Sequence, residues 1–343
     1  MSKIYVSGGH GFISSYVIKE LQSQGHQVIT NVRNNNWHID PIYQDILKDC
    51  DVYNIDIRDE VGVLKLCEQS DGVIHLASIL GTGHVENAKN FYETNLFGTI
   101  NVLEAVREYK IPMVYISVGN YFEHNNYSNS KVAGEREVLK YAKFCDVKGN
   151  IVRALNALGS RQKVKNTGKI MATFITQALK NEPIKVYGGK DRCSIMDMVY
   201  AGDVAKVLCD VLLDLDKFYY VGTVNAEYDV FEIDEYGKHI EQLPDLPTAI
   251  KKNVSYQMTS KKPVLDRRYG NVFEAGTGVG YSVWEIAEMV KEMTGSTSEI
   301  IEVPMRDGET EQSRVVAVKP FPIDYKPLKD IIAETILFYK EQM

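Results

Sequence analysis

The sequence predicts an α/β protein built on a doubly wound parallel sheet, and three observations support this prediction. Short apolar runs alternate with longer segments of helical periodicity through the first half of the chain, as in strands joined by crossover helices. The glycine run Gly8-Gly9-His10-Gly11 stands where the first apolar run passes into the first helical segment. Hydrophobic residues make up 44% of the 343 residues, which is enough to fill a large core.

The sequence pattern of the first half of the chain predicts six strands and four helices. The apolar runs cover 4–6, 27–30, 52–55, 72–75, 113–117 and 150–153. The helical segments cover 12–24, 60–69, 88–109 and 130–144. Strands that are separated by helices pair in parallel, and their crossovers are right-handed. Because helices lie between most of the successive strands, we expect the sheet to be covered on both faces.

The second half is less regular. It predicts a helix over 170–180 and another whose N-cap is Asp203. Residues 214–270 are rich in Tyr, Asp, Glu and Lys without a clean period, and we interpret them as an inserted excursion rather than a separate domain. Ser282 is expected to cap a further helix, because Glu285 stands three residues later and completes a capping box.

Composition argues against several classes of function. The formal net charge is −7 and no basic patch stands out, so the sequence does not predict a nucleic-acid partner. The five cysteines are scattered and form no C-x-x-C pair, so we expect neither a metal site nor a disulfide framework. No apolar stretch approaches the roughly 18 residues that a membrane span needs. Since the N-terminus runs into a predicted strand rather than a signal peptide, we expect a cytoplasmic protein.

The glycine run is the first candidate binding site. Glycine permits a positive φ and a close approach of the backbone, and the N-terminus of the following helix offers free N–H groups to a pyrophosphate. The spacing is G-x-x-G, and Ser14 stands where a third glycine is usual. A structural tight turn is the alternative reading of such a pattern. The position between the first strand and the first helix favours dinucleotide binding by Gly8, Gly9 and Gly11.

The end of the second strand bears on the choice of cofactor. An acidic residue there would bind the ribose 2′-hydroxyl of NAD, but the sequence reads Asn31-Val32-Arg33. Arg33 would suit the 2′-phosphate of NADP, so the sequence favours NADP slightly over NAD. A solvated loop arginine is the alternative reading.

A second candidate site is the pair Tyr127 and Lys131. On a helix, residues four apart share one face. An ammonium group close to a phenol lowers the pKa of the phenol, which lets tyrosine act as a general acid or base near neutral pH. An exposed helical pair is the alternative, but this pair opens the helix that follows the predicted strand 113–117.

In these features the chain resembles the extended short-chain dehydrogenase/reductase family, in its nucleotide-sugar epimerase and dehydratase branch. The resemblance covers nearly the whole chain outside 214–270. In the first half it is carried by Ser-Gly-Gly-His-Gly-Phe-Ile (7–13), Asn-Ile-Asp-Ile-Arg-Asp (54–59), His-Leu-Ala-Ser (75–78), Asn-Leu-Phe-Gly-Thr (95–99) and Tyr-x-x-x-Lys (127–131). In the second half the matching segments are 153–156, 184–188, 202–205, 273–278 and 306–308. Each motif is weak alone, but their order and spacing together are specific.

The resemblance implies a Rossmann-type dinucleotide-binding domain over 1–155 and a smaller α/β region over 156–343 that mainly binds substrate. It implies Tyr127 as the catalytic acid/base and Lys131 as the residue that holds the cofactor ribose. Further cofactor residues that it implies are Gly8, Gly9, Gly11, Phe12, Ile13, Asp56, Ile57, Leu76, Ala77, Ser78 and Asn95. Asn156 and Arg306 would bind the nucleotide of the substrate. As plainer alternatives, Asp56 ends a strand and Arg306 forms a surface salt bridge.

The chain departs from the family near the catalytic pair. The family usually places Ser or Thr where this chain has Val118, and a valine cannot donate a hydrogen bond. Ser117, one residue earlier, is the candidate replacement. Dehydratases resemble Thr-Asp-Glu at this point, whereas this chain has Val118-Gly119-Asn120, so we do not expect 4,6-dehydration.

A second departure concerns the substrate diphosphate. Many relatives clamp it with an arginine at the position that is Met196 here. Arg192 or Arg161 would have to substitute for that arginine. The departure leaves the identity of the substrate open.

The sequence therefore predicts an NAD- or NADP-dependent epimerase or ketoreductase of a nucleotide-activated sugar. Two alternatives stay open at this point: a reductase of a small non-sugar carbonyl, and a non-catalytic dinucleotide sensor or scaffold on the same fold. The resemblance also implies a homodimer that pairs through the helices over 88–109 and 130–144.

Overall fold

We analysed a computed structural model of the chain. It describes residues 1–33, 41–81, 87–162, 169–214, 228–233, 239–243, 256–260, 270–305 and 310–342. Contacts between residues divide the chain into two units. The first comprises Met1–Leu215 and Tyr269–Met343, and the second comprises Asp216–Arg268.

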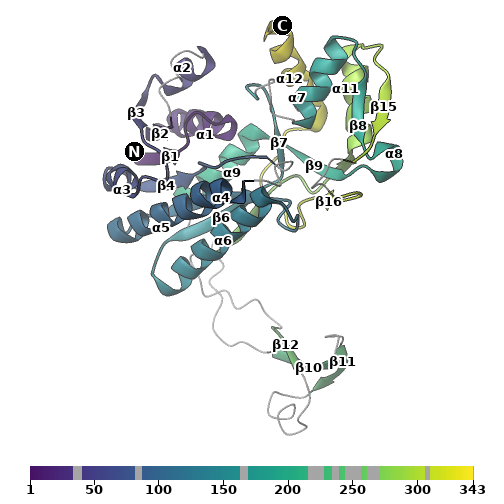
Figure 1. Cartoon of the computed structure of the whole chain (residues 1–343). Coiled ribbons are helices and arrows are strands. Elements are labelled where there is room, and N and C mark those ends of the chain that lie inside the picture. The colour runs from purple at the N-terminus through teal and green to yellow at the C-terminus, as the bar shows by residue number, and fades with distance from the viewer. Residues whose placement is uncertain are drawn as a thin grey trace. The chain divides into compact units, whose positions relative to one another are not determined.

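A seven-stranded sheet forms the centre of the first unit (Figure 1). Its strands are β1 (Lys3–Ser7), β2 (Gln27–Val32), β3 (Cys50–Asn54), β4 (Gly72–His75), β5 (Met113–Val118), β6 (Gly149–Ala154) and β13 (Val272–Ala275). They lie in the order β13-β6-β5-β4-β1-β2-β3, and every neighbouring pair is parallel. The strand order reverses direction between β1 and β4, which is the place where sheets of this kind bind ligands. The predicted fold class is confirmed.

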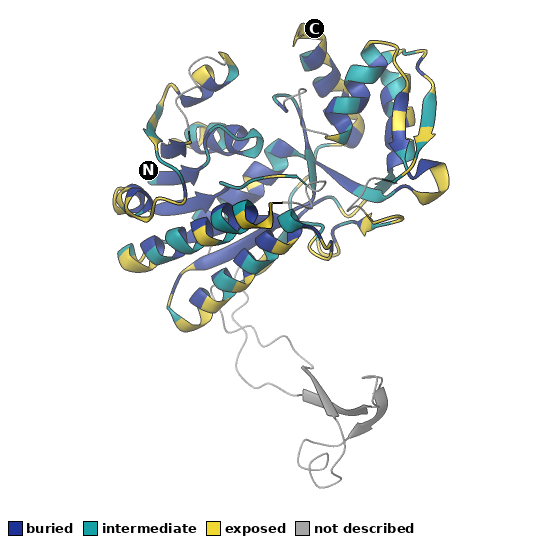
Figure 2. Cartoon of the chain, viewed as in Figure 1, coloured by how far each residue is buried: buried dark blue, intermediate teal, exposed yellow. Residues whose placement is uncertain are grey.

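Helices cover both faces of this sheet. One face is covered by α3 (Glu60–Glu68), α5 (Gly98–Tyr109) and α6 (Asn126–Phe144), and the other by α1 (Phe12–Ser23) and α9 (Ala201–Leu213). The five inner strands are almost wholly buried, as Figure 2 shows, whereas the edge strands β3 and β13 are partly exposed. Runs such as Met113–Val118, in which all six residues are buried, are typical of a strand that packs against helices on both sides. The second half of the chain contributes α9 and β13 to this main sheet.

The predicted elements of the first half are present, with two differences. The expected helix over 88–109 consists of α4 (Ala88–Phe91), a π-helical turn η2 (Tyr92–Phe97) and α5. The last helix begins at Asn126 rather than at residue 130, because the side chain of Asn125 caps it by accepting a hydrogen bond from Ser128 N at 2.8 Å. A short helix that the sequence analysis did not predict is α2 (Pro41–Leu47).

A smaller α/β region packs beyond the carboxyl ends of the main sheet. Its helices are α7 (Ile170–Leu179), α8 (Gly189–Arg192), α11 (Val283–Thr294) and α12 (Leu328–Gln342). Its strands are β7 (Asn156–Leu158), β8 (Ile184–Tyr187), β9 (Ile195–Tyr200), β14 (Gly280–Ser282), β15 (Ile300–Val303) and β16 (Arg314–Val315). β15 pairs with β8, while β9 pairs with β7, β14 and β16. The apolar side chains of α7, α11 and α12 share one buried cluster with those of β8 and β9.

The two predicted helix caps in the second half had different outcomes. Ser282 caps α11, and Glu285 completes the capping box, as predicted. The prediction for Asp203 was wrong, because Tyr200 is the N-cap and Asp203 lies inside the first turn of α9. Its carboxylate accepts a hydrogen bond from Lys326 N at 2.8 Å, so Asp203 joins α9 to the segment that leads into α12.

The second unit contains an antiparallel sheet of three strands in the order β11-β10-β12. They are β10 (Tyr228–Ile233), β11 (His239–Leu243) and β12 (Tyr256–Ser260). The sequence predicts an inserted excursion over 214–270, and the contacts group Asp216–Arg268, which lies within these bounds, into one unit. Polar and apolar residues do not alternate strictly along these strands, which explains why the sequence showed no strand period. Among the described residues, no helix is long and apolar enough to span a membrane.

Candidate active site

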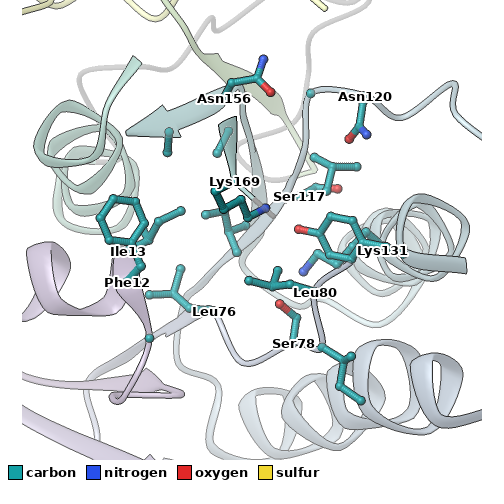
Figure 3. A pocket seen from close by; sticks show the side chains of 18 of the residues that line it. Phe12, Ile13, Leu76, Ser78, Leu80, Ser117, Asn120, Lys131, Asn156 and Lys169 are labelled. Carbon is teal, nitrogen blue, oxygen red and sulfur yellow. The ribbon is translucent and has the colours of Figure 1, made fainter. Parts of the chain in front are cut away.

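A cavity of about 730 Å³ opens at the carboxyl ends of the central strands. Its lining comes from the loops after β1, β2, β3, β4 and β5, from the start of α6, and from the smaller α/β region. Figure 3 shows side chains from these elements turned toward one space, with Phe12 and Ile13 on one side and Lys131 on another. The cavity therefore lies where the strand order of the main sheet reverses, and the smaller α/β region forms part of its wall.

The glycine loop forms one end of the cavity. Gly8 has φ +75°, and a Cβ there would lie 3.0 Å from the Cα of Ala77. Gly9 does not line the cavity but packs on β2, where a Cβ would lie 2.2 Å from Oγ1 of Thr30. Ser14 takes the place of the third glycine and closes the loop, because its hydroxyl donates to the carbonyl of Gly8 at 2.7 Å. The loop thus brings backbone, and no bulky side chain, to the cavity.

The N-terminus of α1 points its free backbone groups at the same end. Gly11 is the N-cap, and it supplies no side-chain cap to the helix. The first N–H groups of α1 and its positive dipole end are therefore available to an anion. Gly11, Phe12 and Ile13 all line the cavity.

Two charged residues stand beside the loops after β2 and β3. Arg33 and Asp56 both line the cavity, together with Ile57. The carboxylate of Asp56 forms an ion pair with Arg58 at 2.8 Å, which is the main cause of its lowered pKa, and Arg33 lowers that pKa further. Arg33 itself is exposed and forms no ion pair with a described residue. At this end of the cavity, Asp56 is therefore already paired with Arg58, whereas Arg33 has no acidic partner among the described residues.

The loop after β4 forms one wall of the cavity, and buried hydrogen bonds hold this loop in place. Ser7 Oγ accepts from Leu76 N at 2.9 Å and from Ala77 N at 3.0 Å, which fixes two of the lining residues. Asn95, in the π-helical turn, accepts from Ile79 N at 2.7 Å and donates to Ser130 Oγ at 3.0 Å. Asn95 does not line the cavity itself. It connects the wall after β4, which includes Ser78, to the helix that carries the Tyr–Lys pair, and π-turns are frequent at such functional places.

Tyr127 and Lys131 lie in the first turns of α6, and both line the cavity. The Lys131 side chain is 1% exposed, and its Nζ sits 4.0 Å from the centroid of the Tyr115 ring. Burial lowers the pKa of Lys131 from 10.5 to about 7, while the charge of Glu135 acts in the opposite direction. No described carboxylate forms an ion pair with this ammonium group, and no described group accepts a hydrogen bond from it.

The expected lowering of the tyrosine pKa is absent in this structure. Burial raises the pKa of Tyr127 above its usual value of 10. The reason is that the surrounding protein removes water from the phenol, while the ammonium of Lys131 faces the ring of Tyr115 instead. The pair is therefore brought to one cavity, where burial rather than Lys131 sets the pKa of Tyr127.

Ser117 supplies the free hydroxyl that the sequence analysis expected near this pair. It lies at the end of β5, is 3% exposed and lines the cavity beside Val118. Its Oγ is buried and has no hydrogen-bond partner. Such an unsatisfied hydroxyl is costly unless a ligand completes it, so Ser117 is poised to bond a group in the cavity.

The candidate substrate residues have different positions. Asn156 lines the cavity, and its side chain donates to the carbonyl of Asp197 at 3.3 Å. Arg161 stacks on the ring of Tyr16 at 3.8 Å, and Arg192 is exposed beside Glu311 at 3.5 Å. Neither arginine is among the cavity residues. Arg306 lies outside the described residues.

Two charged residues of the cavity were not predicted from the sequence. Lys169 is the N-cap residue of α7, and Figure 3 shows its side chain extending into the cavity in the direction of Ser117. The surrounding protein lowers the pKa of Lys169, and no described residue pairs with it. A cation at the positive end of a helix is unfavourable, and this was the signal in the sequence. Glu123 also lines the cavity, is 8% exposed and accepts a hydrogen bond from Thr310 Oγ1 at 2.8 Å.

Comparisons with known proteins match the chain as a whole. Residues 4–226 match the model of the NAD dependent epimerase/dehydratase family. A candidate UDP-glucose 4-epimerase of Methanocaldococcus jannaschii is 30% identical over 270 residues, which is 71% of this chain and 86% of that protein. The UDP-N-acetyl-alpha-D-glucosaminuronate decarboxylase of Bacillus cytotoxicus is 29% identical over 55% of this chain and 65% of that protein. The structure of UDP-glucose 4-epimerase from Thermus thermophilus with NAD shares the fold, with a TM-score of 0.72, 22% identity and coverage of 99% of this chain and 100% of that one.

Proposed function

The chain belongs to the NAD dependent epimerase/dehydratase family, and on that premise we propose that it epimerises a nucleotide-activated sugar at a ring hydroxyl with a nicotinamide dinucleotide. The observation that carries the proposal is a group of polar side-chain atoms in one cavity that bond no described residue. Ser117 Oγ has no partner, and neither Lys131 Nζ nor Lys169 Nζ bonds a described residue. A ketoreductase would use the same groups for half of the cycle.

The cavity fits the cofactor. The backbone of the glycine loop and the start of α1 match a pyrophosphate, since a Cβ at Gly8 would crowd Ala77. Asp56, Ile57 and Arg33 would face the adenosine half, and Leu76, Ala77 and Ser78 would line the remainder. The bare ammonium of Lys131 matches ribose hydroxyls, which would give it the acceptors that the protein does not provide.

In the proposed reaction, Tyr127 removes the proton of the reacting sugar hydroxyl and later returns it. When bound, oxidised nicotinamide supplies a hydride acceptor and a positive charge close to this phenol. The protein raises the pKa of Tyr127, so the residue depends on nearby positive charge to act as a base near neutral pH. Ser117 Oγ would donate to the reacting oxygen and hold it in line with Tyr127.

Lys169 is the proposed contact for the diphosphate of the substrate. Met196 lines the cavity where relatives carry the clamping arginine, and neither Arg161 nor Arg192 reaches the cavity. Lys169 supplies an unpaired positive charge on this side, and it enters from the region where Asn156 also lies. An ammonium group binds phosphate as a point charge, so it can take this role without the fork of an arginine.

The choice between NAD and NADP depends on Arg33. An unpaired arginine after β2 fits a 2′-phosphate, and the usual acid is absent there. Asp56 also lines this end of the cavity, but it follows β3 and its carboxylate is already paired with Arg58. We propose that the site accepts NADP at least as well as NAD.

Native mass spectrometry of the purified protein, followed by a turnover assay, tests the proposed function. An epimerase regenerates its cofactor in each cycle, so it should carry bound dinucleotide and interconvert UDP-glucose and UDP-galactose without added reductant. Net consumption of NADPH with a keto sugar would identify a ketoreductase. Consumption of NADPH with a small carbonyl and no binding of sugar nucleotides would contradict the proposal, and binding of dinucleotide without any turnover would indicate a sensor.

A further inference from the structure

We propose that Glu123 selects the sugar, so that the cavity takes a neutral or amino sugar whose substituent donates a hydrogen bond and disfavours a sugar that carries a carboxylate. The inference rests on the proposed function. It deepens that function by naming the class of sugar that the cavity accepts.

Glu123 is placed to contact the reacting end of a substrate. It lies on the loop between β5 and α6, four residues before Tyr127 and six after Ser117. All three residues line the same cavity. A sugar held between Ser117 and Tyr127 therefore has the Glu123 loop beside it.

Among the described side chains, only Thr310 donates a hydrogen bond to this carboxylate. Thr310 Oγ1 donates to Oε2 of Glu123 at 2.8 Å, and the side chain is 92% buried, since 8% is exposed. Across the described residues, no Lys, Arg or His forms an ion pair with Glu123, and no other side chain donates to it. Lys169 shares the cavity but is not paired with it. A buried carboxylate in this state gains most from a ligand that donates hydrogen bonds or carries positive charge.

The neighbours of Glu123 in the cavity strengthen this conclusion. The carbonyl of Asn120 accepts a hydrogen bond from Glu123 N at 3.1 Å, Thr310 donates to the carboxylate, and both residues are uncharged. A hydroxymethyl or amino group of a sugar would find an acceptor in Glu123 and further polar partners around it. A sugar carboxylate would instead be placed beside a second carboxylate, and like charges repel.

This assigns Glu123 to selection and not to proton transfer. Among the named relatives, one is a candidate epimerase of UDP-glucose, a neutral sugar, and another is a decarboxylase of a glucosaminuronate, an acidic sugar. Glu123 places this chain with the neutral class. The chemistry at the reacting hydroxyl stays with Tyr127.

The test measures the dissociation constants of UDP-glucose, UDP-glucuronic acid and UDP for the protein saturated with NAD. The two sugars differ only in a hydroxymethyl and a carboxylate group, and UDP reports on the nucleotide contacts alone. We expect the wild type to bind UDP-glucose more than about tenfold tighter than UDP-glucuronic acid, which corresponds to about 1.4 kcal/mol. In Glu123→Gln, which keeps the shape and an acceptor for Thr310, this ratio should fall about tenfold, while the affinity for UDP stays unchanged.

The matched control is Glu311→Gln, which removes an exposed carboxylate one residue from Thr310 that does not line the cavity. Its three affinities should equal those of the wild type.

Equal binding of both sugars to the wild type, or an unchanged ratio in Glu123→Gln, would overturn the inference and leave the proposed function standing. Failure of every UDP-sugar to bind would overturn both. Formation of a dehydrated sugar from UDP-glucose that stops in Glu123→Gln would assign Glu123 to catalysis instead. The ratio of the two sugar affinities in the wild type is measured without any variant, so it tests the selectivity for a neutral sugar even if Glu123→Gln folds poorly.

Discussion

Replacing Lys131 by methionine should stabilise the protein without its cofactor and weaken its response to the cofactor. Lys131 is almost fully buried and has no acidic partner within ion-pair distance among the described residues, and burial lowers its pKa from 10.5 to about 7. A difference of this size corresponds to about 5 kcal/mol of destabilisation when the group is fully charged, at 1.36 kcal/mol per pKa unit. The contact with the Tyr115 ring, at 4.0 Å, offsets up to about 2 kcal/mol of this in the native protein.

After this offset and the loss of side-chain packing, we expect Lys131→Met to raise the free energy of unfolding of the stripped protein by about 1–3 kcal/mol near pH 6. The pH dependence has a definite sign. Because the folded pKa, about 7, lies below the unfolded value of 10.5, the cost is fully present below pH 7 and is lost as the pH rises toward 10.5. The advantage of the methionine variant over the wild type should therefore shrink from pH 6 to pH 10.

The assay is urea unfolding of both proteins, stripped of cofactor, at a series of pH values and then with added NAD. NAD should raise the midpoint of the wild type more than that of Lys131→Met, because the variant lacks the proposed ribose contact. A variant that is less stable than the wild type at pH 6, or a stability difference that grows with pH, would refute the reasoning. Lys140→Met, at an exposed position of the same helix, is the control and should show neither effect.

Three further predictions concern other parts of the structure. Asp197→Ala removes a buried carboxylate that accepts from Thr277 N, Thr277 Oγ1, Gly278 N and Ala317 N, so it should lower the free energy of unfolding by about 3–5 kcal/mol in a chemical denaturation experiment. Lys169→Ala should weaken the binding of UDP about tenfold or more in calorimetry while leaving the binding of NAD unchanged, whereas equal loss for both ligands would contradict a role limited to the substrate. Arg33→Ala should reduce the affinity for NADP at least about tenfold relative to NAD, and an unchanged ratio would remove Arg33 from cofactor selection.

The parts of the fold that follow from local pattern were predictable from the sequence. Buried strands such as Met113–Val118 are nearly continuous apolar runs, and the glycine run predicts a tight strand-to-helix turn. The capping box at Ser282 also depends on neighbouring residues alone. The cap predicted at Asp203 failed because its carboxylate is used by Lys326 N, more than a hundred residues away.

The candidate site was predictable only where a residue belongs to a motif. Ser117, Tyr127 and Lys131 lie at the ends of predicted elements, and the structure brings them to one cavity. Glu123 and Lys169 come from loops, whose position depends on contacts distant in sequence, such as that between Glu123 and Thr310. The raised pKa of Tyr127 also could not be read from spacing, because it depends on which way the Lys131 ammonium points.

The most direct test of the central claim is the rate of interconversion of UDP-glucose and UDP-galactose by the wild type and by Tyr127→Phe. The substitution removes one hydroxyl and leaves the ring in place, so binding of NAD and of UDP should be nearly unchanged. The account predicts a loss of turnover of about a hundredfold or more, since general acid–base catalysis contributes about 10²–10⁴ in rate. Tyr127→Phe with the turnover of the wild type would contradict the account.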